Sequence, residues 1–127
     1  MIRDLQRMRM RVALATATPE VRARKYLRMV GAEAAFDAVA CAEMVAHGKP
    51  APDVYLLAAR KLNLPPRVLL GVEDSPSGVQ SAHAAGMTVA MVPDQDQPSA
   101  EIAALCALVA PSLAGIAPFV KESLRRL

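Results

Sequence analysis

The chain has 127 residues, which is enough for one ordinary domain and too few for two. Hydrophobic residues make up 54% of it and aromatic residues 3%, so we expect a core of Ala, Val, Leu and Met, and intrinsic disorder is excluded. The formal net charge is +3, and Tyr26 is the only aromatic residue interleaved with the basic residues of the first quarter. This pattern favours solvated helix faces over a nucleic-acid surface.

The cysteines and the longest apolar run exclude further classes. Cys41 and Cys106 stand far apart without a second pair, which indicates buried reduced thiols rather than a zinc site or a disulfide framework. The nearly apolar run 107–120 is interrupted by Pro111 and Pro118 and is too short to span a membrane. With no secretory signal visible, we predict a cytoplasmic protein without a membrane partner.

Apolar runs alternate with amphipathic segments along the chain. In chain order the expected elements are a helix at 2–8, a strand at 12–15, a helix that Thr18 caps and Gly31 stops, a strand at 38–42, a helix at 52–62, a strand at 68–72, a helix that Ser75 caps and Gly86 closes, a strand at 88–92, a helix at 99–105, a strand at 107–110 and a helix at 113–127. This alternation predicts an α/β fold with a parallel sheet covered by helices on both faces. Ligands of such folds bind beyond the carboxyl ends of the strands.

Polar residues follow the first two expected strands. Thr16 and Ala17 precede a helix start, where free amides and the helix dipole favour a phosphate. For Thr16 a phosphate contact and a purely structural role are equally consistent with the sequence, whereas Thr18 fits an N-cap better. In the later loop HGKPAPD two prolines stiffen the backbone around Lys49, whose ammonium can neutralise a phosphate. His47 is interpreted as a neighbour of that lysine.

Adjacent carboxylates follow the third expected strand. Glu73 and Asp74 repel each other at this strand end, so a compensating cation is expected. Magnesium prefers one or two carboxylates together with waters or phosphate oxygens. The three strand ends together therefore predict a site for magnesium and phosphate.

The segments ALATATP, HGKPAPD, LLGVEDSPSGVQSAHAAGM and TVAMVP, in this order, resemble the haloacid dehalogenase-like hydrolase superfamily and, within it, the β-phosphoglucomutase-like phosphatases. The resemblance covers nearly the whole chain. It implies a Rossmann-like core that performs magnesium-dependent phosphoryl transfer on a small phosphorylated metabolite, typically a sugar phosphate.

The resemblance also implies roles for single residues. Thr16 and the Ala17 amide would grip the phosphoryl oxygens, and Lys49 would neutralise the phosphate and the nucleophile. Glu73 and Asp74 would hold Mg²⁺. Ser75 would support that site through its hydroxyl and backbone.

The family's reaction starts at an Asp-x-Asp-Gly-Thr motif on its first strand, where one aspartate attacks phosphorus and the other is the general acid and base. This motif and the substrate-selecting cap domain are absent from the sequence. The run Asp94-Gln95-Asp96 has the right spacing but lacks the Gly and Thr, so we interpret it as a solvated loop. Residues 1–127 are therefore expected to form a single partial core domain without its central first strand.

Loss of about ten ladder hydrogen bonds at roughly 1 kcal/mol each is comparable to a domain's whole stability. Such a chain should close the gap, borrow a strand or aggregate. Three hypotheses remain. The chain is the carboxyl-terminal part of a phosphatase or phosphomutase that lacks an amino-terminal segment and is inactive alone; it is a non-catalytic module or a half-enzyme completed by a partner chain; or it is an unrelated α/β binding module.

Overall fold

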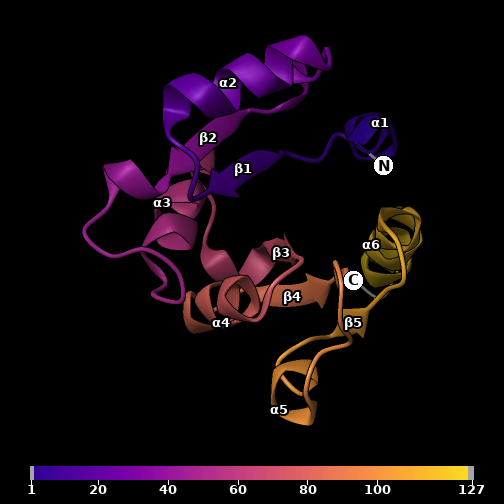
Figure 1. Cartoon of the computed structure of the whole chain (residues 1–127). Helices are drawn as coiled ribbons and strands as arrows, with labels where there is room; N and C mark the ends of the chain where they lie inside the picture. The colour runs from indigo at the N-terminus through magenta and orange to yellow at the C-terminus, as the bar shows by residue number, and fades with distance from the viewer. Residues whose placement is uncertain (1, 126–127) are drawn as a thin grey trace.

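The computed structural model describes residues 2–125. Its helices are α1 (Ile2–Arg7), α2 (Glu20–Met29), α3 (Asp53–Leu62), α4 (Pro76–Ala84), α5 (Ala100–Ala103) and α6 (Ile116–Arg125), and its strands are β1 (Ala13–Thr16), β2 (Ala38–Cys41), β3 (Leu70–Glu73), β4 (Thr88–Met91) and β5 (Leu108–Val109) (Figure 1). The predicted alternation of strands and helices is confirmed. The last two residues of the helix predicted at 113–127 lie outside the described residues.

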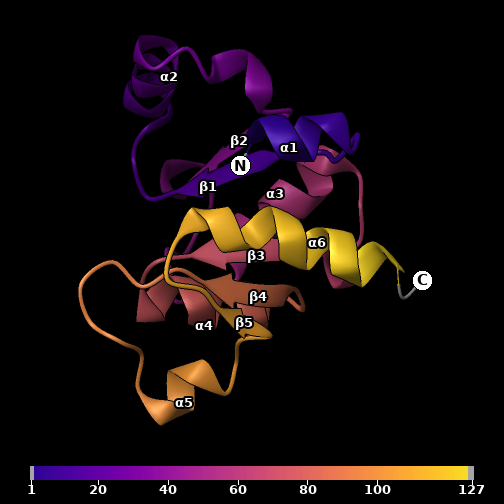
Figure 2. The same ribbon diagram turned by 90° about the vertical axis from the view of Figure 1, so that its right-hand side faces the viewer.

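The parallel sheet is present in two pieces. β1 pairs with β2, with Ala13 opposite Ala38, and β3 pairs with β4, with Leu70 opposite Thr88; β5 continues the second piece. In the described part of the chain, β1 and β3 form no ladder with each other. Figure 2 shows them as facing edges, with β1 and β2 above β3, β4 and β5. Among the described residues the parallel sheet is therefore interrupted between β1 and β3, and this gap has not closed.

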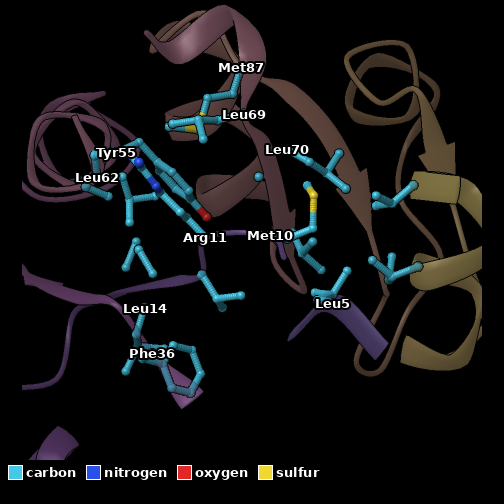
Figure 3. Close-up of a pocket in the computed structure, with 18 of the residues that line it drawn as sticks. Leu5, Met10, Arg11, Leu14, Phe36, Tyr55, Leu62, Leu69, Leu70 and Met87 are labelled. Carbon is cyan, nitrogen blue, oxygen red and sulfur yellow. Dashed lines mark hydrogen bonds between the residues drawn. The ribbon is translucent and has the colours of Figure 1, made fainter. Parts of the chain in front are cut away.

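An apolar cavity of about 340 Å³ occupies the gap between β1 and β3. We call it the inter-sheet slot; it is bounded by residues 12–15 along β1, by residues 69–72 along β3, and by helix side chains such as Leu5 and Tyr55 (Figure 3). Its one charged lining residue, Arg11, donates a hydrogen bond of 2.7 Å to the Leu62 carbonyl at the end of α3. The slot is therefore an apolar space between two strand edges.

Backbone polar groups of both strands point into this slot. The Leu69 carbonyl accepts from the Thr88 N–H at 3.2 Å, toward β4, and the Val12 carbonyl accepts from the Asp37 N–H at 2.7 Å, toward β2. Successive residues of a strand direct their N–H and C=O groups to opposite edges. The groups that this alternation leaves without a ladder partner belong to Ala13, Ala15, Leu70 and Val72.

Helices cover both faces of the second sheet piece. The side chains of Val89 and Met91 pack in one core cluster with α3 and α4, whereas Ala90 between them packs with Ile116 and Val120 of α6. This is the period-two alternation of a strand that is buried on both faces. In Figure 2, α6 crosses in front of β3.

Several predicted boundaries are wrong by one to three residues; the last helix, predicted from 113, begins at Ile116 after a 3₁₀ turn, and two other differences have a clear cause. The third strand begins at Leu70 rather than Val68, because Pro66–Val68 form a 3₁₀ turn that leaves Val68 58% exposed. Helix α2 begins at Glu20 after Pro19, which takes the N-cap position without a side-chain hydrogen bond, so Thr18 does not cap it. No helix among residues 2–125 is long and apolar enough to cross a membrane; the cytoplasmic location stays a prediction.

The free thiols of Cys41, which is buried, and Cys106, which is partly buried, predict that stability falls in alkali. Burial, followed by the charges of Glu20 and Glu43, raises the pKa of Cys41, and burial raises that of Cys106. In the unfolded chain these thiols ionise at about pH 8.5, so above that pH the unfolded state loses protons that the folded state keeps. We expect a lower urea midpoint at about pH 10 than at about pH 7. An equal or higher midpoint in alkali would contradict this.

Candidate active site at the carboxyl ends of β1 and β3

A second cavity, of about 360 Å³, lies where β1 and β3 end. It is lined by residues of β1 and the loop that follows it, of the segment between β2 and α3, and of the turn that joins β3 to α4. The structure brings all the predicted site residues to this one cavity: Thr16, Ala17, Lys49, Glu73, Asp74 and Ser75. Their individual roles stay predictions.

Lys49 is held by contacts on three sides. Its Nζ donates to Glu73 Oε2 at 2.7 Å and to the Ala15 carbonyl at 3.3 Å, and it lies 5.4 Å from the centre of the Tyr55 ring. The ring face adds a favourable cation–π contact. An ammonium has three N–H donors, so one remains for a ligand in the cavity. The side chain is 18% exposed, which leaves that donor accessible.

Glu73 is a nearly buried carboxylate with two donors on one oxygen. Its Oε2 accepts from Lys49 and, at 2.6 Å, from the Tyr55 hydroxyl, and its side chain is only 7% exposed. The other oxygen lies so close to Gly78 that a Cβ at that position would overlap it. Glu73 is therefore built into the site as the counter-ion of Lys49, a pairing that the sequence pattern did not predict.

Tyr55 is a site residue that sequence reasoning missed. Burial first, then the charge of Glu73 and the hydrogen bond to it, raises the pKa of the Tyr55 hydroxyl well above its ordinary value. The hydroxyl therefore stays protonated and donates to Glu73. A signal was available, because a tyrosine on the apolar face of α3 must find a partner for its O–H when it is buried.

Thr16 already accepts one hydrogen bond. Its Oγ1 accepts from the Thr18 N–H at 3.1 Å, and the hydroxyl can still donate its own proton to a ligand. At the start of α2 the Glu20 N–H donates to Glu43 Oε1 at 2.7 Å. A carboxylate thus already occupies one of the free N–H groups at this helix end.

Ser75 and Asp74 open the turn into α4. Ser75 Oγ accepts from the Gly78 N–H at 3.2 Å, which confirms the predicted N-cap. Asp74 is exposed and lines the cavity; among residues 2–125 its carboxylate has no hydrogen-bond or salt-bridge partner. That free carboxylate fits a magnesium ligand. Among the described residues there is no group of three or more His, Cys, Asp or Glu side chains that could hold a metal ion.

Two further polar groups lie outside the cavity lining. His47 is exposed, and its Nδ1 lies 3.2 Å from Asp53 Oδ2 at the start of α3, which agrees with its interpretation as a neighbour of Lys49. Asp94 and Asp96 lie in an exposed loop after β4. That loop does not line the cavity, as expected for a solvated segment.

The comparison with protein families agrees with this geometry. The family model of the haloacid dehalogenase-like hydrolases matches residues 1–86, which is more than half of the chain. The chain belongs to this family.

Within the family, a phosphorylated carbohydrates phosphatase of Thermotoga maritima is 42% identical over 79 residues, which cover 62% of this chain and 37% of that protein. A putative β-phosphoglucomutase from Thermotoga maritima superposes with a TM-score of 0.83 at 32% identity, covering 95% of this chain and 56% of that structure. The CbbY protein of Rhodobacter sphaeroides in complex with phosphate gives a TM-score of 0.79 at 32% identity, covering 89% and 51%. The chain thus spans between about a third and just over a half of the length of these relatives.

Proposed function

We propose that this chain provides the phosphate-binding and metal-binding side of an active site for magnesium-dependent phosphoryl transfer on small phosphorylated metabolites. The observation that carries the proposal is the convergence of Thr16, Lys49 and Asp74 on one cavity beyond the strand ends. The Thermotoga relative named as a phosphorylated carbohydrates phosphatase makes sugar phosphates the first substrate class to assay.

The protein groups bind and orient the phosphoryl group. The free N–H of Lys49 and the Thr16 hydroxyl would donate to its oxygens, with the Ala17 backbone beside them. Charge-assisted hydrogen bonds of this kind are shorter and about twice as strong as neutral ones. Positioning and charge neutralisation are the main contributions that a protein makes to phosphoryl transfer.

The donor set near the strand ends fits magnesium. Asp74 would hold the ion directly, because its carboxylate is exposed and unpaired among the described residues. Glu73, which is paired with Lys49 in the absence of phosphate, would add negative charge behind it. When bound, Mg²⁺ would neutralise charge on the phosphoryl oxygens and orient them.

One observation favours a second candidate, a half-enzyme that a partner chain completes. The inter-sheet slot ends beside the cavity, and its two edges carry unpaired backbone groups. A strand inserted there would emerge at the carboxyl ends of β1 and β3. It would deliver its next residues, a nucleophile among them, to Lys49 and Asp74.

The phosphate proposal predicts separable losses in binding. By calorimetry with inorganic phosphate and MgCl₂, Lys49→Met is expected to weaken phosphate binding by about tenfold or more, because a charged hydrogen bond is lost. Asp74→Asn is expected to remove the enhancement by magnesium and to leave metal-free phosphate binding near that of the native chain.

Matched controls come from exposed residues of the same type. Lys25→Met on α2 and Asp94→Asn in the loop after β4 also remove a charge, but far from the cavity lining. Both should bind phosphate and magnesium like the native chain. Equal phosphate affinity in the native chain and Lys49→Met would refute the site.

A further inference from the structure

We propose that Tyr55 is a positioning residue: its hydroxyl keeps Glu73 Oε2 hydrogen-bonded when Lys49 shifts from that carboxylate to a phosphoryl oxygen. The inference rests on the proposed function, since it concerns how the same site is loaded. The observation behind it is that two donors share one carboxylate oxygen. Tyr55 Oη and Lys49 Nζ both donate to Glu73 Oε2, at 2.6 and 2.7 Å.

Phosphate binding acts first on the Lys49 ammonium. Lys49 contacts Glu73 and the Ala15 carbonyl from the side of the strand ends, and its remaining donor is free for the cavity. A doubly charged phosphate competes with Glu73 for the same ammonium. Binding therefore weakens or breaks the Lys49–Glu73 pair.

The second step concerns the carboxylate left behind. The Glu73 side chain is 7% exposed, and water has little access to it. A buried carboxylate without any donor is strongly unfavourable, which would oppose the shift of Lys49. A donor that stays on Oε2 lowers this cost, and Tyr55 is the other donor to that oxygen.

The third step concerns the tyrosine itself. Tyr55 is 6% exposed and belongs to the core cluster of α3, α4 and β4, so its ring is fixed by packing. Figure 3 shows that its side chain reaches across the inter-sheet slot. Its hydroxyl lies 2.6 Å from Glu73 Oε2, and the packed ring holds it at that distance. It therefore remains a donor in the free and in the phosphate-bound state.

The test follows the Lys49 ammonium and the Tyr55 hydroxyl proton by NMR while the 127-residue chain is titrated with inorganic phosphate at constant MgCl₂. In the native chain the Lys49 resonance should shift with phosphate, and the Tyr55 hydroxyl proton should stay protected from exchange at saturation. Loss of that protection in step with the Lys49 shift would overturn the proposal. This measurement needs no variant.

Phosphate affinities of two variants provide a second test of the role of Tyr55. Tyr55→Phe keeps the ring and removes one oxygen, and it is expected to weaken phosphate binding about tenfold while the amide spectrum away from the site is unchanged. Tyr26 lies on α2 and is exposed, so Tyr26→Phe is the matched control and should bind phosphate like the native chain. Unchanged affinity in Tyr55→Phe would contradict the positioning role.

The two proposals fail in different ways. If Lys49→Met binds phosphate as well as the native chain, the proposed function fails. If Lys49→Met loses binding and Tyr55→Phe does not, the site stands and only the role of Tyr55 is refuted.

Discussion

Gly78→Ala is expected to destabilise the chain by about 2 kcal/mol and to disturb the Lys49–Glu73 pair. Gly78 lies in the first turn of α4, where alanine is favoured over glycine by about 1 kcal/mol. Against this, its Cβ would overlap the Glu73 carboxylate, which is buried and cannot move into solvent. Overpacking of this kind, with displacement of a paired buried charge, costs about 3 kcal/mol and outweighs the gain in helix propensity.

Urea unfolding at constant pH measures this loss, and Gly48→Ala is the matched control. Gly48 lines the same cavity, but a Cβ there would meet no atom within 4 Å. The free energy of unfolding of the Gly48→Ala variant should differ little from that of the native chain. Equal stability of the two variants would mean that the carboxylate can leave Gly78 freely. Phosphate affinity should fall in Gly78→Ala and not in Gly48→Ala.

A single extended apolar strand that enters the inter-sheet slot is expected to stabilise the chain substantially. A ligand of the folded state at about a hundred times its Kd adds about 2.7 kcal/mol. For a chain of this size that corresponds to a rise in Tm of about 10 °C. The slot favours such a ligand because its lining is apolar and its two edges are parallel and unpaired.

The probe is a synthetic peptide of about five valine and isoleucine residues with lysines at both ends. A peptide with proline at its centre is the control, because proline has no N–H and is excluded from central strands. Protection of the Leu70 and Val72 amides in hydrogen exchange should increase with the first peptide. An unchanged Tm, or equal protection by the proline peptide, would show that the slot does not accept a strand.

Local sequence patterns were sufficient to predict the order of the elements and the cavity in which the candidate site residues lie. Strands and helices follow from local periodicity, and the Ser75 cap follows from local hydrogen bonding to the Gly78 N–H. Parallel strands separated by helices must bring their carboxyl ends to one edge. For this reason the sequence predicts that Thr16, Lys49 and Asp74 lie close together, and in the structure they line one cavity.

The pairing of the charged groups in that cavity depends on long-range contacts of the tertiary structure. Lys49 and Glu73 are 24 residues apart, and Tyr55 and Glu73 are 18 apart, so no local pattern links them. The Glu43 carboxylate accepts from the Glu20 N–H at the start of α2, and this contact is likewise long-range. For this reason the local prediction of a Thr18 cap was wrong. The open slot between β1 and β3 is also a tertiary feature. Strand order and side-chain packing across the sheet depend on the whole chain, whereas strand and helix formation depend mainly on neighbours in sequence.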